Sequence, residues 1–459
     1  GAGPSSAPRA AAAKSTAARR VSSSPSSLAS CGSRLREGGL VSFPTETVYG
    51  LGCHALDPSA VEGVFRAKER PLSDPLIVHV TRDEDALNLW SACSSLSPTA
   101  ADDEEEEEES SAESSPPSSI ESRALRALTS AFWPGPLTIV ASASPSVPPI
   151  VTASTGYVAC RAPSHPVARA VIDAAGVPIA APSANKFGHV SPTRADHVLD
   201  DLGREDVWVV DPAADGDGGG EERSGENGAP SAAAADGSDD GKICHVGVES
   251  TVAKVEMSPG GGGGGGEERR GSVTILRHGA VSSADVRRAL AEAGLSSHFD
   301  VSSLVRSTPD HVANVAPGQT VRHYSPDVVS YMIAQSRYGN GNGNGGVAEL
   351  SDDERTLLSS AVVIDFGGKL ASLRDVALAY RDLSPSNESA EAASCVFEAL
   401  RWAEDVEGAQ RVYFPEVVVP AGSHGGEEGD YMEDEDALAH AVKDRLTRAA
   451  SGEMIETLR

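Results

Sequence analysis

The sequence predicts an α/β fold: a twisted mixed sheet with helices in a first domain, and a small Rossmann-like α/β domain at the C-terminal end. Over residues 40–293, many short apolar runs alternate with few helical segments, which is typical of a mixed sheet. After residue 328, strand-like runs and helical segments follow in βαβα order, which favours a small parallel sheet. The 459 residues are enough for two or three domains.

The first strands of the mixed sheet enclose a polar segment. Two apolar runs, residues 40–43 and 76–80, flank a polar turn, a Gly-punctuated loop and one short helix. Asp57 as N-cap and Pro58 at the first helical position predict where that helix begins. It ends in the charged, Pro-broken segment 68–71. Hydroxyls, a carboxylate, two cations and a histidine thus lie at the ends of buried elements, which indicates a functional site.

The remaining elements follow in chain order. In the first domain we expect strands at residues 137–141, 157–161, 177–181, 207–210, 248–255 and 273–276, and helices at 27–37, 120–132, 165–175 and 283–293. In the C-terminal domain we expect strands at 361–366 and 411–414 and helices at 389–404 and 436–450.

Composition divides the chain into four parts. Residues 1–26 form a disordered leader or transit-peptide remnant, 27–293 the first domain, 294–327 a linker, and 328–459 the C-terminal domain. Ser/Glu-rich and Gly-rich segments at about 97–119, 213–241 and 257–271 predict disordered insertions in the first domain.

The leader bears on the compartment. It contains Arg9, Lys14, Arg19 and Arg20 among many Ala and Ser residues, and no acidic residue. This composition fits an organellar transit peptide, and it fits a plain basic disordered segment equally well. We therefore expect a cytoplasmic protein, with the mitochondrion or plastid as the alternative.

Composition also excludes several classes of protein. The formal net charge of −29 is carried largely by acidic blocks such as residues 102–109, which are usually solvated. It argues against a surface that binds nucleic acid without specificity. The six cysteines form no CxxC pair, so we expect neither a zinc site nor a disulfide framework. No apolar run approaches the roughly 20 residues of a membrane span.

Cations and hydroxyls recur at the ends of the expected strands. They are Lys68, Arg70, Arg161 and Arg277, with Thr45, Thr47, Ser183, Ser191, Ser250 and Thr251. A single Arg of this kind is explained by a surface salt bridge. Several that converge with hydroxyls can hold a triphosphate and an α-carboxylate without a covalent intermediate. No GxSxG, Walker A or HExxH sequence offers a competing chemistry.

Successive motifs resemble those of the YrdC family, in the family's order. They are SFPTETVYGLG, KERPLSDPLIVHV, FWPGPLT, VACRAPSHP, PIAAPSAN with SPT, GVESTV and ILRHG. The later APGQTVRHYSP resembles the linker of the two-domain threonylcarbamoyl-AMP synthase branch of the family. RDLSP, CVFEALR and AVKDRLTRAA resemble that branch's C-terminal domain. The similarity covers residues 30–459 apart from the insertions.

The resemblance implies a YrdC-like sheet with a large cavity, and L-threonylcarbamoyladenylate synthase activity. In that reaction L-threonine, bicarbonate and ATP, with Mg²⁺, give threonylcarbamoyl-AMP and pyrophosphate. The product feeds the t6A modification of tRNA through a downstream threonylcarbamoyl transferase.

The resemblance also implies roles for individual residues. Lys68 and Arg70 are the implied catalytic residues. L-Threonine is expected to contact Thr47, His79, Arg161, Ala181 and Ser250. ATP is expected to contact Arg70, Asp74, Tyr157, Ser183, Ser191, Arg277 and Tyr324. No residue is implied as a metal ligand, and Tyr324 in the linker is expected to fold back over the nucleotide as a lid.

Two residues depart from the family's usual pattern. Glu69 stands where the family commonly has Gly in KGRP, and we expect it to point to solvent. Asp74 stands where Asn is frequent, which loses a hydrogen-bond donor and keeps an acceptor.

Two other functions remain open at this point. The family's first domain also resembles a double-stranded RNA binder, which would imply weak RNA binding without catalysis. A carbamoyltransferase of the hydrogenase-maturation type uses a related domain, but this chain lacks the CxxC zinc fingers expected there.

Overall fold

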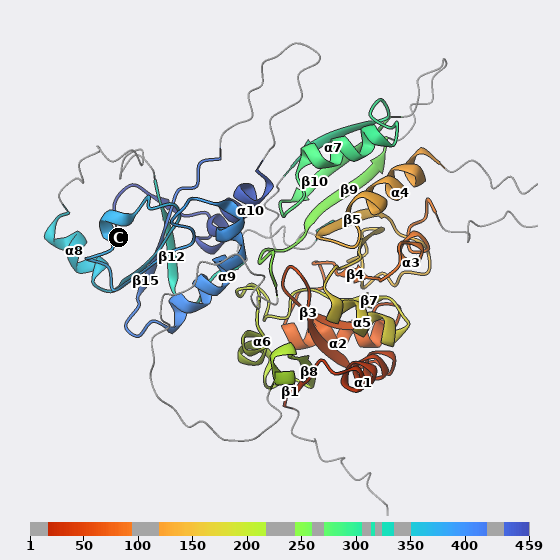
Figure 1. Ribbon diagram of the computed structural model, residues 1–459, viewed down its shortest axis with the longest axis horizontal. Coiled ribbons are helices and arrows are strands. Elements are labelled where there is room, and N and C mark those ends of the chain that lie inside the picture. The colour runs from red at the N-terminus through yellow and green to blue at the C-terminus, as the bar shows by residue number, and fades with distance from the viewer. Residues whose placement is uncertain are drawn as a thin grey trace, which may run out of the picture.

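The computed structural model describes residues 17–93, 119–216, 244–258, 270–304, 314–316, 324–334, 350–419 and 436–458. Within these residues the chain forms two sheets, one of eleven strands and one of five, which lie side by side in Figure 1. The expected α/β class is therefore confirmed. No helix in the described ranges is long and apolar enough to cross a membrane.

The larger sheet is mixed, and its strand order is β1-β8-β2-β3-β7-β4-β6-β5-β9-β10-β11. The strands are β1 (Arg19–Val21), β2 (Leu40–Pro44), β3 (Tyr49–His54), β4 (Ile77–His79), β5 (Leu137–Ser142), β6 (Tyr157–Arg161), β7 (Ile179–Ala180), β8 (Val207–Val210), β9 (Thr251–Met257), β10 (Gly271–Arg277) and β11 (Phe299–Ser303). The helices that cover it are α1 (Pro25–Arg36), α2 (Pro58–Lys68), α3 (Asp83–Leu87), α4 (Ile120–Phe132), α5 (Pro166–Ala175), α6 (Ala195–Leu202) and α7 (Ser283–Glu292), with a short 3₁₀ turn η1 (Pro212–Gly216).

The smaller sheet is parallel throughout, as its βαβα order predicts. Its strand order is β14-β13-β15-β12-β16. The strands are β12 (Val329–Ile333), β13 (Ala361–Asp365), β14 (Ala379–Asp382), β15 (Arg411–Pro415) and β16 (Met454–Ile455), and the helices are α8 (Asp352–Leu358), η3 (Ala371–Leu373), α9 (Ser389–Asp405) and α10 (Ala437–Ala449). In Figure 1, α10 lies on the side of this domain that faces the first domain.

The N-terminal boundary differs from the predicted one. Residues 19–21, which we assign to the leader, form β1 and pair in parallel with β8. Arg20 then pairs with Asp211 at 2.7 Å and also with Asp196. Arg19 and Arg20, two of the four cations that we assign to the leader, therefore belong to the edge strand of the sheet. Composition alone does not reveal this. The predicted insertions lie almost entirely outside the described residues.

Local sequence signals account for the helix that precedes the site. Asp57 caps α2 by accepting a hydrogen bond from the Ser59 amide at 2.9 Å, and Pro58 begins the helix, both as predicted. The apolar face of α2 packs into the main core of the first domain, with Val61, Val64 and Phe65 buried. The packing holds the end of α2 next to the sheet, where Lys68 and Arg70 lie.

Strand register brings the expected site residues to one edge. In the parallel pair β4 and β6, His79 lies opposite Arg161 at the ends of both strands. In the antiparallel pair β9 and β10, Arg277 lies opposite Val252, just after Ser250. The turn that carries Thr45 and Thr47 joins β2 to β3. Residues far apart in the chain are thus adjacent in space.

Candidate active site

Three of the four expected cations share one hollow. Arg70, Arg161 and Arg277 all line it, and each is buried, with at most 7% of its surface exposed. The full set of lining residues is Thr45, Thr47, Val48, Tyr49, Gly50, Arg70, Ile77, His79, Arg161, Ala181, Pro182, Ser183, Glu249, Ser250, Arg277 and Tyr324.

Every residue expected to contact L-threonine lines this hollow. The five are Thr47, His79, Arg161, Ala181 and Ser250. Arg161 Nη1 donates a hydrogen bond to Thr47 Oγ1 at 2.9 Å. Thr47 Oγ1 also lies 2.8 Å from Thr45 Oγ1, so the turn between β2 and β3 presents two linked hydroxyls to the hollow.

Glu46 is a site residue that the sequence analysis does not assign. Its Oε1 lies 2.7 Å from Arg161 Nη2, and both side chains are buried. Burial by itself raises the pKa of Glu46, but the Arg161 charge together with the hydrogen bonds from Arg161 and from backbone amides outweighs burial and lowers that pKa to about 2. The carboxylate therefore stays ionised and neutralises most of the Arg161 charge. A carboxylate between two threonines in a turn gave only a weak signal.

His79 contributes a neutral imidazole to the hollow. Burial, reinforced by the neighbouring Arg161 charge, lowers its pKa to about 3. A ring with that pKa carries no charge at neutral pH. It can therefore donate or accept a hydrogen bond without repelling the arginines.

Ser250 and Arg277 form the opposite wall. Arg277 donates from Nε to the Ser250 carbonyl at 3.0 Å and from Nη2 to Ser250 Oγ at 3.1 Å. Ser250 Oγ also lies 2.7 Å from Thr138 Oγ1. These contacts fix the guanidinium in one orientation at the end of β10.

Arg70 is held by its own loop. Its Nη2 lies 2.9 Å from Asp74 Oδ2 and donates to the Pro75 carbonyl at 2.8 Å. Asn314 of the linker donates to Asp74 Oδ1 at 3.4 Å. Asp74 thus lies behind Arg70 as its counter-ion and is not itself part of the lining.

Three other expected residues lie away from the hollow's surface. Lys68 Nζ donates to the Ser183 carbonyl at 2.6 Å and to the Asn185 carbonyl, so it supports the loop that carries Ser183. Ser191 Oγ donates to Glu249 Oε1 at 2.5 Å, one layer behind the wall. Tyr157 donates to Glu256 Oε1 at 2.5 Å and does not line the hollow. The sequence did not predict the direction of these three side chains.

Glu69 points away from the hollow, as we expected. Its side chain is 77% exposed and pairs with Lys186 at 2.9 Å. Its backbone is left-handed, with φ of 56°, at the C-terminal end of α2. Glycine adopts this conformation without steric cost, which explains why KGRP suits this position.

The linker reaches the hollow at Tyr324. This side chain lines the hollow, is only 1% exposed, and packs against Phe397 of α9 with 5.3 Å between ring centroids. Upstream, Ala316 is buried against Ile77, Val140 and other residues of the large sheet. Ala316 and Tyr324, the two described linker residues on either side of this segment, therefore both lie next to the hollow.

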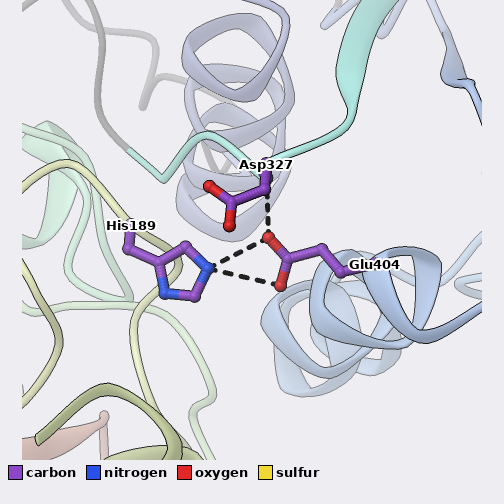
Figure 2. Close-up of side chains that lie close together, drawn as sticks. All are labelled: His189, Asp327 and Glu404. Atoms are coloured by element: carbon purple, nitrogen blue, oxygen red, sulfur yellow. Dashed lines mark hydrogen bonds and ion pairs between the residues drawn. The ribbon is translucent and has the colours of Figure 1, made fainter.

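A second polar cluster joins the linker to both domains. Figure 2 shows His189, Asp327 of the linker and Glu404 of α9 close together, with ligand-type atoms within 4.8 Å of one another. Such groups can bind a divalent cation. Here, however, His189 Nδ1 lies 2.9 Å from Asp201 and Nε2 lies 3.0 Å from Glu404, so both ring nitrogens already face carboxylates.

The cluster is therefore best described as an interdomain imidazolium bridge. Burial by itself lowers the pKa of His189, but the hydrogen bonds to Asp201 and Glu404 outweigh burial and raise that pKa to about 9. Asp327 contributes its backbone amide, which donates to Glu404 Oε1 at 2.8 Å.

Comparisons with known proteins identify relatives of this chain. A family model described as "Telomere recombination" matches residues 33–221, and one described as "Threonylcarbamoyl-AMP synthase, C-terminal domain" matches residues 281–451. A threonylcarbamoyl-AMP synthase from Pyrococcus abyssi is 32% identical over 303 residues, which are 66% of each chain. One from Alkalilimnicola ehrlichii is 34% identical over 181 residues, which are 39% of this chain and 80% of that protein.

A crystal structure of P. abyssi Sua5 complexed with L-threonine is 26% identical, with a TM-score of 0.63, and the match covers 96% of this chain and 99% of that chain. In sequence, the match spans 66%, 49% and 58% of the lengths of the relatives from P. abyssi, Bacillus subtilis and Schizosaccharomyces pombe.

Proposed function

Because the chain belongs to the threonylcarbamoyl-AMP synthase family, with its YrdC-like domain and its own C-terminal domain, we propose that it makes threonylcarbamoyl-AMP and pyrophosphate from L-threonine, bicarbonate and ATP. The observation that carries this proposal is the shared hollow, in which three buried arginines meet a neutral histidine and hydroxyl groups.

The proposed chemistry is an in-line displacement at the α-phosphate. Bicarbonate takes up a proton and loses water to give CO₂, and the deprotonated amine of L-threonine captures that CO₂ and releases a proton to form a carbamate. The carbamate oxygen then attacks that phosphorus while pyrophosphate leaves. The barrier arises from charge repulsion and from positioning, so buried cations lower it by electrostatic stabilisation. Arg70 and Arg277 are the proposed cations for the phosphates, because their contacts fix both guanidinium groups beside the hollow.

Arg161 is the proposed partner of the L-threonine carboxylate. Of its five N–H groups, those directed to Thr47, Glu46 and the Gly135 carbonyl are engaged within the described structure. Because Nη2 is itself buried, the remaining Nη1 side of the guanidinium is the part proposed to meet the carboxylate. Because Glu46 offsets its charge, Arg161 orients the amino acid more than it attracts it.

Mg²⁺ is proposed only as part of the ATP substrate. The carboxylates beside the hollow, Glu46, Asp74 and Glu249, each pair with an arginine among the described residues. They do not suit a metal ion in addition, whereas Mg²⁺ readily binds through phosphate oxygens and water. No step is therefore assigned to a protein-bound metal.

Pyrophosphate release, measured with and without L-threonine and bicarbonate, tests the proposal. The synthase releases pyrophosphate only when both are present, together with a product of the mass of threonylcarbamoyl-AMP. The RNA-binding alternative predicts no such release and a steep salt dependence of RNA affinity. It is disfavoured because the three arginines are buried, where a polynucleotide backbone cannot reach them.

The proposed product is expected to pass to a separate transferase that modifies tRNA. The basic segment 1–16 lies outside the described residues, so the compartment stays a prediction.

A further inference from the structure

One arginine of the C-terminal domain reaches the wall of the hollow. Arg445 of α10 is fully buried, and its Nε donates to Glu249 Oε2 at 3.1 Å. Its Nη1 donates to the His278 carbonyl at 2.7 Å, next to Arg277 at the end of β10. The guanidinium thus contacts two strand ends of the first domain from outside that domain.

Glu249 is the acidic group in the lining of the hollow, and its position is electrostatically costly. It lines the same hollow as Arg277, to which we assign the phosphates. An uncompensated carboxylate there repels a polyphosphate and competes for the arginine. Its two oxygens are instead engaged by protein groups, one by Ser191 Oγ at 2.5 Å and the other by Arg445 Nε at 3.1 Å.

Arg445 also supports the linker residue of the hollow. Its guanidinium carbon lies 5.5 Å from the centroid of the Tyr324 ring, which lines the hollow. Nη2 of Arg445 has no hydrogen-bond partner among the described residues. A buried donor without a partner costs stability, so this placement is not explained by stability alone.

We infer that Arg445 is a positioning residue through which the C-terminal domain completes the nucleotide pocket: it neutralises Glu249 and holds Tyr324 in the wall. This inference deepens the proposed function and rests on it for the identity of the ligand. It assigns the C-terminal domain a direct part in ATP affinity, so that the pocket is complete only while the two domains are docked.

The test uses the full-length chain and five variants: R445M, E249Q, R401M, and E249Q combined with each of R445M and R401M. Arg401 is the matched control, because it is also a buried arginine of the C-terminal domain. It pairs with Asp201 at 3.2 Å and donates to the Val190 carbonyl, so it bridges the domains without contacting Glu249. Binding of a non-hydrolysable ATP analogue and the KM for ATP are measured separately from kcat.

We expect R445M to weaken binding of the analogue and raise the KM for ATP by about tenfold or more, with a smaller effect on kcat. Adding E249Q to R445M should recover at least about fivefold of that loss, because the unpaired charge is removed. Adding E249Q to R401M should recover nothing. Circular dichroism verifies that each variant is folded.

Two results would overturn the inference: wild-type affinity for the analogue in R445M, or an R445M defect that E249Q does not relieve. Failure of the proposed function has a different signature. In that case the wild-type chain releases no threonine-dependent pyrophosphate, whatever the effect of R445M on nucleotide binding.

Discussion

Arg161, which lines the hollow, forms a buried ion pair with Glu46, which does not, and 2.7 Å separates Nη2 from Oε1. Arg161 also contacts Thr47, 114 residues away in the chain. The pair joins the end of β6 to the turn between β2 and β3. The geometry of the part of the hollow that we propose binds L-threonine therefore depends on a carboxylate that must stay ionised.

The ion pair between Glu46 and Arg161 should make the stability of the fold fall at acidic pH. The pKa of Glu46 is about 2 in the folded chain and 4.5 in its ordinary state, so its stabilisation is present above pH 4.5 and is lost as the pH falls toward 2. Glu46→Gln should cost about 3 kcal/mol of unfolding free energy at pH 7, and less as the pH falls. Denaturant unfolding of the wild-type chain and the variant across this pH range measures the difference between their unfolding free energies. A gap that is constant with pH would contradict the assigned pKa.

Arg70 should contribute to the transition state. Arg70→Ala is expected to cost about 3 kcal/mol of transition-state stabilisation, or roughly 100-fold in kcat/KM, comparable to the loss of one preorganised donor. Arg66→Ala is the control, since Arg66 is an exposed cation of α2, the helix that precedes Arg70. Steady-state pyrophosphate release gives both values. Equal kinetics for the two variants would remove Arg70 from the site.

The hydroxyl of the amino acid should decide selectivity. His79 and Ser250 line the hollow with groups that can pair with a hydroxyl, whereas valine leaves them without a partner. We expect kcat/KM for L-threonine to exceed that for L-valine by at least about 100-fold. Ser250→Ala should narrow this ratio. Competition between the two amino acids, followed by mass spectrometry of the adenylates, measures it, and equal turnover would refute the pocket assignment.

Glu69→Gly should stabilise the chain. The change relieves a left-handed backbone at φ 56°, worth about 1 kcal/mol, and removes only an exposed ion pair with Lys186. Glu62→Gly, in the exposed interior of the same helix, should instead destabilise it by about 0.5–1 kcal/mol. Thermal unfolding compares the two. Melting temperatures that move in the same direction would show that φ is not the cause.

The His189 bridge should weaken in alkali. Because its pKa is raised from 6.5 to about 9, its stabilisation is complete below pH 6.5 and is lost as the pH rises through about 9. The carboxylates that face it are Asp201, Glu404 and Asp327, and Arg401 pairs with Asp201. His189→Gln should therefore lower the melting temperature at pH 6 and have little effect near pH 10. Thermal unfolding over this pH range tests the sign.

Many residues of the candidate site could be predicted from the sequence, because a charged residue at the end of a buried apolar strand must lie at an edge of the sheet. Arg161 and Arg277 are the last residues of two apolar strands, β6 and β10. Polar groups that follow a buried strand come to lie at the end of that strand, where functional sites are common. Asp57 and Pro58 specify where the helix that precedes Arg70 begins. These signals are local, so they predict which residue types gather and at which end of the sheet.

The chain's own order of residues thus established the α/β class, the parallel C-terminal sheet and most of the residues that line the hollow. Only folding in three dimensions decided which side chains are turned toward it: Lys68 supports a loop from behind, Tyr157 lies outside, and Glu46 and Arg445 become partners of distant groups. The reason is that the direction of a side chain beyond the end of a strand depends on charges and packing supplied by other elements. For Arg445 and Glu249, 196 residues apart, that partner is in another domain.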